Sequence, residues 1–108
     1  MRERSRKPAA EYRIPDDVVK WIGVHFSTSE HRSALEALAA AVDHAGQAPG
    51  PRLVRCAAMA SRGRLDQLLE YVRLLRIDYR DVIVAGEYEI RGEELVRVRD
   101  LNQPITDV

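Results

Sequence analysis

The fold class follows from one segment, RLDQLLEYVRLLR at residues 64–76. Its apolar residues recur at the three- and four-residue spacing of an amphipathic α-helix, while charged residues occupy the opposite face. The apolar face consists of Leu65, Leu68, Leu69, Val72 and Leu75. Gly63 precedes the segment and is expected to separate it from the element before. The pattern predicts a helix whose leucine face lies in the core.

Residues 51–61, PRLVRCAAMAS, predict a second helix immediately upstream. Pro51 suits the first position of a helix because its missing N–H has no partner there. Leu53, Val54 and Cys56 could also begin a strand, but the alanines that follow are depleted in strands and favourable in helices. Helix is therefore the preferred interpretation, with a strand at 52–60 as the alternative.

Two further helices are expected nearer the N-terminus. Ser27–Glu30 is a helix start signal, the apolar residues after it keep helical spacing, and Gly46 is expected to end that helix. Asp16 as N-cap and Gly23 after the last turn would frame a shorter helix, although its β-branched residues would equally suit a strand running to Phe26. Residues 1–12 lack anything to bury and are interpreted as a flexible basic arm, with 13–108 as a single globular helical domain.

A fifth short helix is expected to begin at Asp78, whose side chain can cap it, and to run to about Gly86. The alternative over residues 81–90 is a strand, because 82–84 are all β-branched. Beyond it, alternation predicts a small hairpin that turns at Arg91–Gly92. That hairpin would place two glutamates opposite two arginines, namely Glu87 and Glu89 opposite Arg97 and Arg99.

These elements together predict a mainly α fold, a compact bundle of four to five short helices with a possible C-terminal β-hairpin. An α+β architecture is the alternative. The composition agrees, because 45% apolar and 31% charged residues in 108 are typical of one globular domain and not of a disordered chain. No apolar run is long enough for a membrane span, and the N-terminus lacks the apolar region of a secretory signal.

The cysteine content indicates the cellular compartment, and the basic residues indicate the kind of gene. The single cysteine, Cys56, cannot form an internal disulfide and fits a reducing, cytoplasmic compartment. Arginine accounts for almost all of the 17 basic residues, a bias expected of a GC-rich bacterial gene. The same number of acidic residues makes the chain neutral overall. Residues 51–80 nevertheless carry a net positive charge and residues 81–108 a net negative charge.

No constellation of catalytic or metal-ligating residues is visible. His25, His31, His44 and Cys56 lack the close spacing of a zinc site, and no nucleophile elbow, phosphate loop or dinucleotide fingerprint occurs. Cys56 sits among alanines, where a thiol behaves as a small apolar group. We therefore expect no catalytic residue, no metal ligand, no cofactor and no enzymatic activity.

One local feature could bind an anion. Ser61, Arg62, Gly63 and Arg64 form a corner before a helix, where free backbone N–H groups would lie beside two guanidinium groups. The alternative is a turn between helices with solvated arginines. A wider nucleic-acid surface is disfavoured by the neutral total charge, by the absence of a stacking platform and by the acidic residues that follow.

The function that we expect is therefore protein–protein contact, with a homo-oligomer or another protein as partner and no membrane. The basic and acidic parts of the chain can pair within one copy or between copies. A small core also gains stability from association. Anion or nucleic-acid binding through the arginine corner is the alternative.

Overall fold

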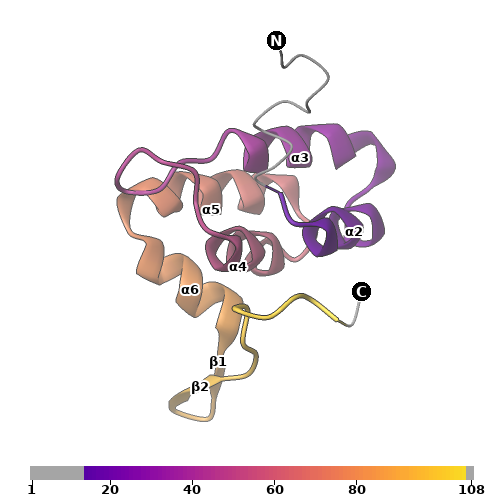
Figure 1. The fold of residues 1–108 in the computed structure, drawn as a ribbon. Helices are drawn as coiled ribbons and strands as arrows, with labels where there is room; N and C mark the ends of the chain where they lie inside the picture. The colour runs from indigo at the N-terminus through magenta and orange to yellow at the C-terminus, as the bar shows by residue number, and fades with distance from the viewer. Residues whose placement is uncertain (1–13, 107–108) are drawn as a thin grey trace.

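The chain passes through five α-helices and then a β-hairpin in the computed structural model, which describes residues 14–106 (Figure 1). The helices are α2 (Asp16–His25), α3 (His31–Ala39), α4 (Pro51–Ser61), α5 (Leu65–Ile77) and α6 (Tyr79–Glu87), with a 3-10 turn η1 (Thr28–Glu30) before α3. Strands β1 (Tyr88–Arg91) and β2 (Glu94–Arg97) pair antiparallel. The prediction of a mainly helical fold with a C-terminal hairpin is confirmed. The arm predicted at residues 1–12 lies outside the described range.

Helix α4 lies at the centre and contacts α2, α5 and α6. Its inner face carries small side chains, so neighbouring backbones approach closely. At Gly86 in α6, an added Cβ would lie only 2.7 Å from the Cα of Cys56 in α4. The largest fully buried apolar side chains of the described residues are Ile22, Leu38, Leu68, Leu75, Val18, Val54 and Val82.

Several local signals act as the sequence predicts. Pro51 is at the start of α4, and the Asp78 carboxylate caps α6 by accepting a hydrogen bond of 3.2 Å from the Arg80 N–H. Helix α4 ends at Arg62, which adopts the left-handed conformation with φ 54°, and Gly63 follows with φ 80°. Residues 52–60 and 81–87 are thus helical and not strands.

Helix α2 is longer than predicted, because Gly23 lies inside it and not after its last turn. The helix starts after Pro15 and continues to His25. The Phe26 N–H still donates to the Ile22 carbonyl at 3.0 Å, and Trp21 and Phe26 are both buried. Burial of this aromatic pair offsets the helix penalty of glycine, which is about 1 kcal/mol.

Helix α3 is shorter than predicted, because it ends at Ala39 and Gly46 lies in the loop beyond it. Asp43 explains the early end. Its carboxylate accepts hydrogen bonds from the N–H groups of Ala45 at 2.8 Å and Gln47 at 3.0 Å. Asp43 thus offers this backbone a turn that competes with the helix.

The leucine face of α5 is also narrower than predicted. Leu68 and Leu75 are completely buried, whereas Leu69 is 50% exposed. Leu68 and Leu75, seven positions or two helical turns apart, therefore define the buried face of α5, which contacts α3, α4 and α6, and Leu69 lies at its edge.

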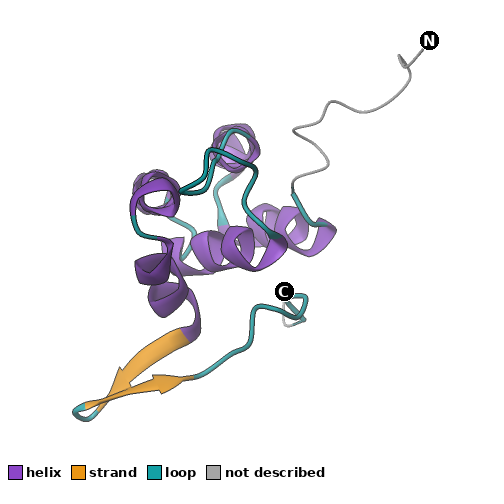
Figure 2. Cartoon of the chain, turned by 60° about the vertical axis from the view of Figure 1, so that its left-hand side comes forward, coloured by secondary structure: helices purple, strands orange, loops and turns teal. Residues whose placement is uncertain are grey.

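The hairpin extends away from the helices, and the tail after it returns toward α2 and α4 (Figures 1 and 2). Its loop is Gly92–Glu93, one position later than the predicted turn, and Arg91 pairs with Glu94 across it. Gly92 has φ 65° while Glu93 has a negative φ, the pattern of a type II′ turn. The prediction of a hairpin is confirmed.

Candidate functional site

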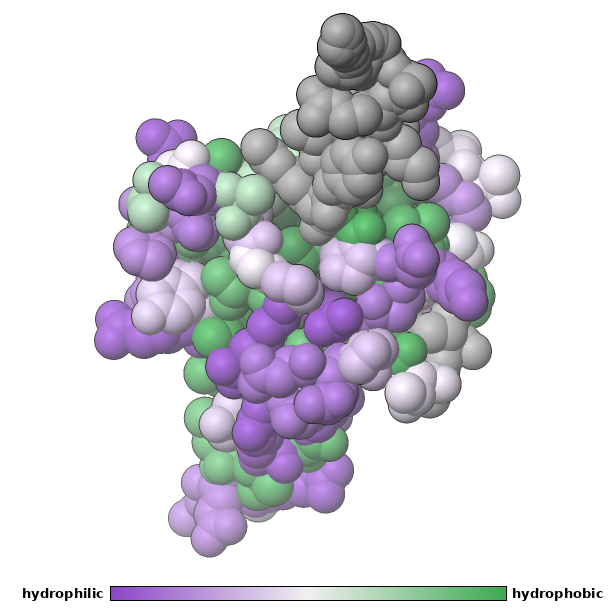
Figure 3. Space-filling model, in the orientation of Figure 1, coloured by the Kyte–Doolittle hydropathy of each residue, from purple (hydrophilic) through white to green (hydrophobic). Residues whose placement is uncertain are grey.

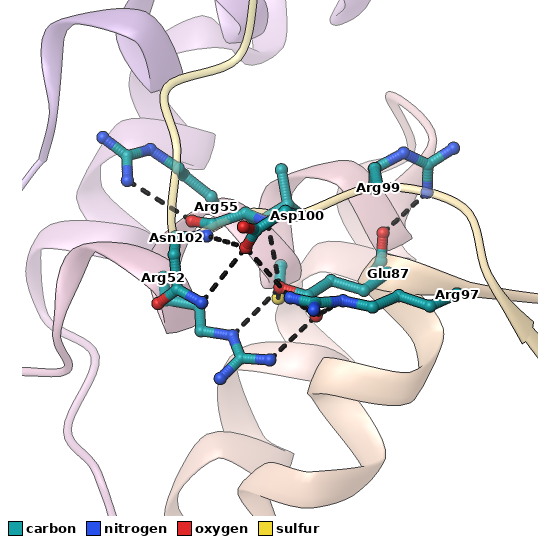
Figure 4. A network of polar contacts seen from close by, with 10 residues as sticks. Arg52, Arg55, Glu87, Arg97, Arg99, Asp100 and Asn102 are labelled. Carbon is teal, nitrogen blue, oxygen red and sulfur yellow. Dashed lines mark hydrogen bonds and ion pairs between the residues drawn. The ribbon is translucent and has the colours of Figure 1, made fainter.

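A buried carboxylate lies where α6 becomes β1. Glu87 is completely buried, and Arg52 of α4 donates two hydrogen bonds to it, at 2.9 and 2.8 Å (Figure 4). Arg97 of β2 donates a third at 3.1 Å, and the Leu101 N–H donates a fourth at 3.0 Å. Glu87 therefore joins the central helix, the hairpin and the tail. The hairpin was predicted to bring Glu87 and Glu89 to face Arg97 and Arg99, and ion pairs form between Glu87 and Arg97 at 3.1 Å and between Glu89 and Arg99 at 3.6 Å. The register differs from the predicted one, since Glu87 is the last residue of α6 and Glu89 lies directly opposite Val96.

The charge of Glu87 is preserved by these partners. Burial by itself would raise the pKa of its carboxyl group. The hydrogen bonds from Arg52 and Leu101, together with the charges of Arg52 and Arg97, outweigh burial and hold the pKa below its ordinary value. Glu87 is thus an ionised structural group with its acceptor oxygens occupied, and it is not arranged as a proton donor.

A second carboxylate holds the end of the tail in the same way. Asp17 of α2 accepts hydrogen bonds from Arg55 at 2.9 and 3.3 Å and from the Ile105 N–H at 3.0 Å. Burial acts to raise the pKa of Asp17, but these bonds and the Arg55 charge hold it below its ordinary value. Leu101 and Ile105, whose N–H groups bond to the two carboxylates, are themselves buried. We call Arg52, Arg55, Asp17 and Glu87 the tail clamp.

The tail clamp provides acidic partners for two arginines of the basic segment. Arg52 and Arg55 belong to the basic middle segment, and their partners lie 35 and 38 positions away. Arg52 and Glu87 thus join the basic segment to the acidic one within one copy, whereas Arg55 pairs with Asp17 near the N-terminal end of the described residues. Two of the most central arginines are consequently unavailable to a nucleic acid or to a partner's carboxylates.

The thiol of Cys56 contacts the clamp but is inert. It lies 3.9 Å from a Glu87 oxygen and is completely buried. Burial, followed by the nearby Glu87 charge, raises its pKa to about 12. The thiolate that nucleophilic chemistry requires is therefore suppressed, as the alanine-rich context predicts.

The structure separates the side chains of the predicted anion-binding corner. Ser61 is buried, and its hydroxyl donates to the Ala58 carbonyl at 2.6 Å and accepts from the Gly63 N–H at 3.3 Å. Arg62 and Arg64 are exposed but line different pockets, and Arg64 pairs with Asp66 at 3.2 Å. The corner thus has the geometry of a tight turn between helices, and anion binding by it stays a prediction.

Arg62 lines an open pocket of about 400 Å³ at the root of the hairpin. The other lining residues are Trp21, His25, Met59, Ala85, Tyr88, Glu89 and Arg99. Within residues 14–106 Arg62 makes no ion pair, while Arg99 donates to the Gly86 carbonyl at 2.6 Å. The pocket is therefore mixed in charge, with one uncommitted guanidinium group at its rim.

The most exposed of the large apolar residues in the described part of the chain, Ile90, belongs to a cross-strand apolar pair on the hairpin. Ile90 of β1 is 76% exposed and lies directly opposite Leu95 of β2, which is 54% exposed. Figure 3 shows hydrophobic atoms at this lower end of the molecule, beside strongly hydrophilic ones. This pair was not predicted, although the sequence carries a signal for it, since Ile90 and Leu95 are equidistant from the Gly92–Glu93 loop.

Two other kinds of site are missing from the described part of the chain. Residues 14–106 contain no group of three or more His, Cys, Asp or Glu side chains that could hold a metal ion. No helix in this range has both the length and the apolar character needed to cross a membrane. His31, one of the three histidines, hydrogen-bonds the Phe26 carbonyl at 3.0 Å and so has a local structural partner.

Comparison of the chain with family models, with curated proteins and with solved structures gives no match in any of the three. The candidate function therefore rests on the geometry of the hairpin and the tail clamp.

Proposed function

We propose that the protein works through protein–protein contacts and that copies of it associate through the β-hairpin. The observation that carries the proposal is the cross-strand pair Ile90–Leu95, which is exposed on a hairpin that stands clear of the helices. An apolar pair at the end of a projecting element is typical of a contact surface and adds nothing to the core.

The open edges of the hairpin support the same proposal. The sheet has only two strands, so each strand has an outer edge with unpaired backbone N–H and C=O groups. Two strands alone are marginally stable in water, and pairing with further strands stabilises them. Such edges can pair with another chain, and this hairpin carries exposed isoleucine and leucine side chains beside its unpaired backbone groups.

The tail clamp gives the hairpin a fixed base. Glu87 precedes β1 directly, and Arg97 at the end of β2 bonds to the same carboxylate. Both strands are therefore anchored at one buried point before any partner binds. A preorganised element loses less conformational entropy on binding, which favours association.

The experiment measures molecular mass by light scattering over a hundredfold range of protein concentration, in low and in high salt. We expect a dimer that dissociates on dilution and that tolerates salt, because its contacts are apolar and backbone hydrogen bonds. The double variant Ile90→Thr, Leu95→Thr should stay monomeric. Ile77→Thr is the matched control, since Ile77 is 62% exposed on α5 and lies outside the hairpin. A monomeric wild type, or equal effects of both variants, would contradict the proposal.

The proposal includes neither catalysis nor a cofactor, and it places the protein in the cytoplasm. A lone buried thiol suits a reducing compartment, because disulfides are rare there.

Anion binding is the second candidate, and the uncommitted guanidinium of Arg62 at the pocket rim supports it. Titration with inorganic phosphate, followed by NMR shifts of the Trp21 indole in the same pocket, tests it. Saturable shifts in the wild type that disappear in Arg62→Ala would support it. Shifts that persist in Arg62→Ala would remove Arg62 from the site.

A further inference from the structure

We infer that two copies join β1 to β1 in antiparallel orientation about a twofold axis at Ile90, which makes one four-stranded sheet. This inference rests on the self-association proposed above and specifies its register. It follows from three features of the hairpin: which backbone groups face outward, which residues can lie on a twofold axis, and how the charges then align.

The outward-facing backbone groups of β1 follow from the hydrogen-bond pattern. Antiparallel pairs alternate between hydrogen-bonded and non-bonded residues. The Val98 N–H donates to the Glu87 carbonyl at 2.7 Å, so Glu87 is in a bonded pair, and Glu89 and Arg91 follow in alternation. The N–H and C=O groups of Tyr88 and Ile90 therefore point out of the sheet, toward the free edge.

Twofold symmetry and charge together limit the register on this edge. In a symmetric antiparallel pair one residue faces its own copy, in either a hydrogen-bonded or a non-bonded pair. An axis at Glu89 would place two glutamates opposite each other and an axis at Arg91 two arginines, and like charges directly opposite are destabilising. Tyr88 and Ile90 are the other two choices. With Tyr88 on the axis, Ile90 would face Gly86 of the second copy, which belongs to helix α6 and cannot continue a strand. Ile90 on the axis remains.

In this register oppositely charged residues face each other across the axis. Residues on either side of the axis face each other, so Glu89 lies opposite Arg91 of the second copy, and the reverse contact repeats it. Both side chains are accessible, with 41% and 64% exposure. Their contacts within one copy are long, at 3.5 Å for Arg91 to Glu89 and 3.6 Å for Arg99 to Glu89, and leave them able to pair across the axis.

The apolar residues also come together in this register. Ile90 contacts its own copy on the axis, and Leu95 lies beside it on β2 in each copy. The two cross-strand pairs thus form one apolar strip across four strands, and burial of that strip stabilises the dimer.

The edge of β2 is less suited to a second copy. Its outward-facing residues are Leu95 and Arg97. An axis at Glu94 or Arg97 would place like charges opposite each other. An axis at Leu95 or Val96 would not bring Glu94 opposite Arg97 of the second copy. Arg97 is also bound to Glu87 and, at 2.9 Å, to Asp100. The charge pattern therefore favours β1.

Cross-linking of the full-length chain tests the register. Ile90→Cys should form a disulfide-linked dimer under mild oxidation, because paired Cα atoms across a strand interface are about 5.5 Å apart. Leu95→Cys is the control: it is similarly exposed, but three strand spacings of roughly 4.8 Å separate it from its copy, too far for a disulfide. The native Cys56 is buried and does not interfere.

A charge exchange gives a second readout that requires no cysteine. Glu89→Arg should weaken dimerisation about three- to tenfold because two pairs per dimer become repulsive. The combination Glu89→Arg, Arg91→Glu should restore wild-type affinity. Failure of the combination to restore affinity would overturn the inferred register.

The two proposals fail in distinguishable ways. A wild type that is monomeric at every concentration contradicts both. A wild-type dimer in which Leu95→Cys cross-links and Ile90→Cys does not would retain self-association and overturn the pairing of β1 with β1. If Ile90→Cys proves monomeric under reducing conditions, the charge exchange alone decides the register.

Discussion

Replacement of Glu87 by glutamine is the sharpest test of the tail clamp. The amide keeps the shape of the side chain but loses the charge that faces Arg52 and Arg97. Removal of one partner from a buried ion pair costs about 3–5 kcal/mol. The side chains of Arg52 and Arg97 are 35% and 41% exposed, so water can solvate them when the charge of Glu87 is lost. We therefore expect Glu87→Gln to lower the free energy of unfolding by about 3 kcal/mol, the lower end of that range.

Urea unfolding measures this loss directly. The fluorescence of Trp21, the only tryptophan and 5% exposed, reports on the core, and far-ultraviolet circular dichroism reports on the helices. With a urea dependence of about 1.5 kcal/mol per molar, a loss of 3 kcal/mol lowers the midpoint by about 2 M. Both probes should shift together if the domain unfolds cooperatively.

Glu70→Gln is the matched control, because Glu70 also receives two hydrogen bonds from one arginine, Arg73, but on the exposed surface of α5. Exposed pairs contribute little to stability, so its midpoint should stay close to the wild type. The reasoning is refuted if Glu87→Gln and Glu70→Gln shift the midpoint equally, because burial would then have no bearing on the strength of the clamp.

The remaining predictions concern pH and close packing. Glu87 and Asp17 have pKa values below their ordinary 4.5 and 3.8 in the folded state, so the unfolded chain binds protons first as the pH falls. Folding stability should therefore decrease below about pH 4.5, and the decrease should be shallower in Glu87→Gln than in the wild type when urea midpoints are compared across pH. Gly86→Ala should destabilise the fold by about 1–3 kcal/mol, because its Cβ would lie 2.7 Å from the Cys56 backbone. Gly23→Ala should instead stabilise α2 by about 0.5–1 kcal/mol, since nothing lies within 4 Å of the added methyl group; similar midpoints for the two variants would contradict this packing.

Local sequence signals were sufficient for the central and C-terminal helices. Pro51, Gly63 and Asp78 each act on the backbone within a few residues, so their effect can be inferred without knowledge of distant partners. The same reasoning misplaced the end of α2, where burial of Trp21 and Phe26 outweighs the preference of Gly23. Tertiary packing and not local propensity decides that boundary.

The tail clamp was beyond sequence reasoning for a different reason. Its bonds join Arg52 to Glu87 and Asp17 to Ile105, residues that are 35 and 88 positions apart. Leu101 and Ile105 belong to the core and are four positions apart, but they lie in an irregular tail, so their spacing does not reflect a helix and does not explain their burial. The hairpin itself was predictable, but the exposure of Ile90 depends on where the clamp directs the strands.

The joining of the tail to α2 also bears on how the protein forms during synthesis. Helices α2 and α4 are made early, yet Asp17 and Arg55 acquire their remaining tail partners only when Leu101 and Ile105 have been translated. Until then two ionised side chains and the apolar surface beneath the tail face water. Native stability is thus complete only after translation through residue 105. Before that point the exposed apolar surface leaves the nascent chain open to premature association.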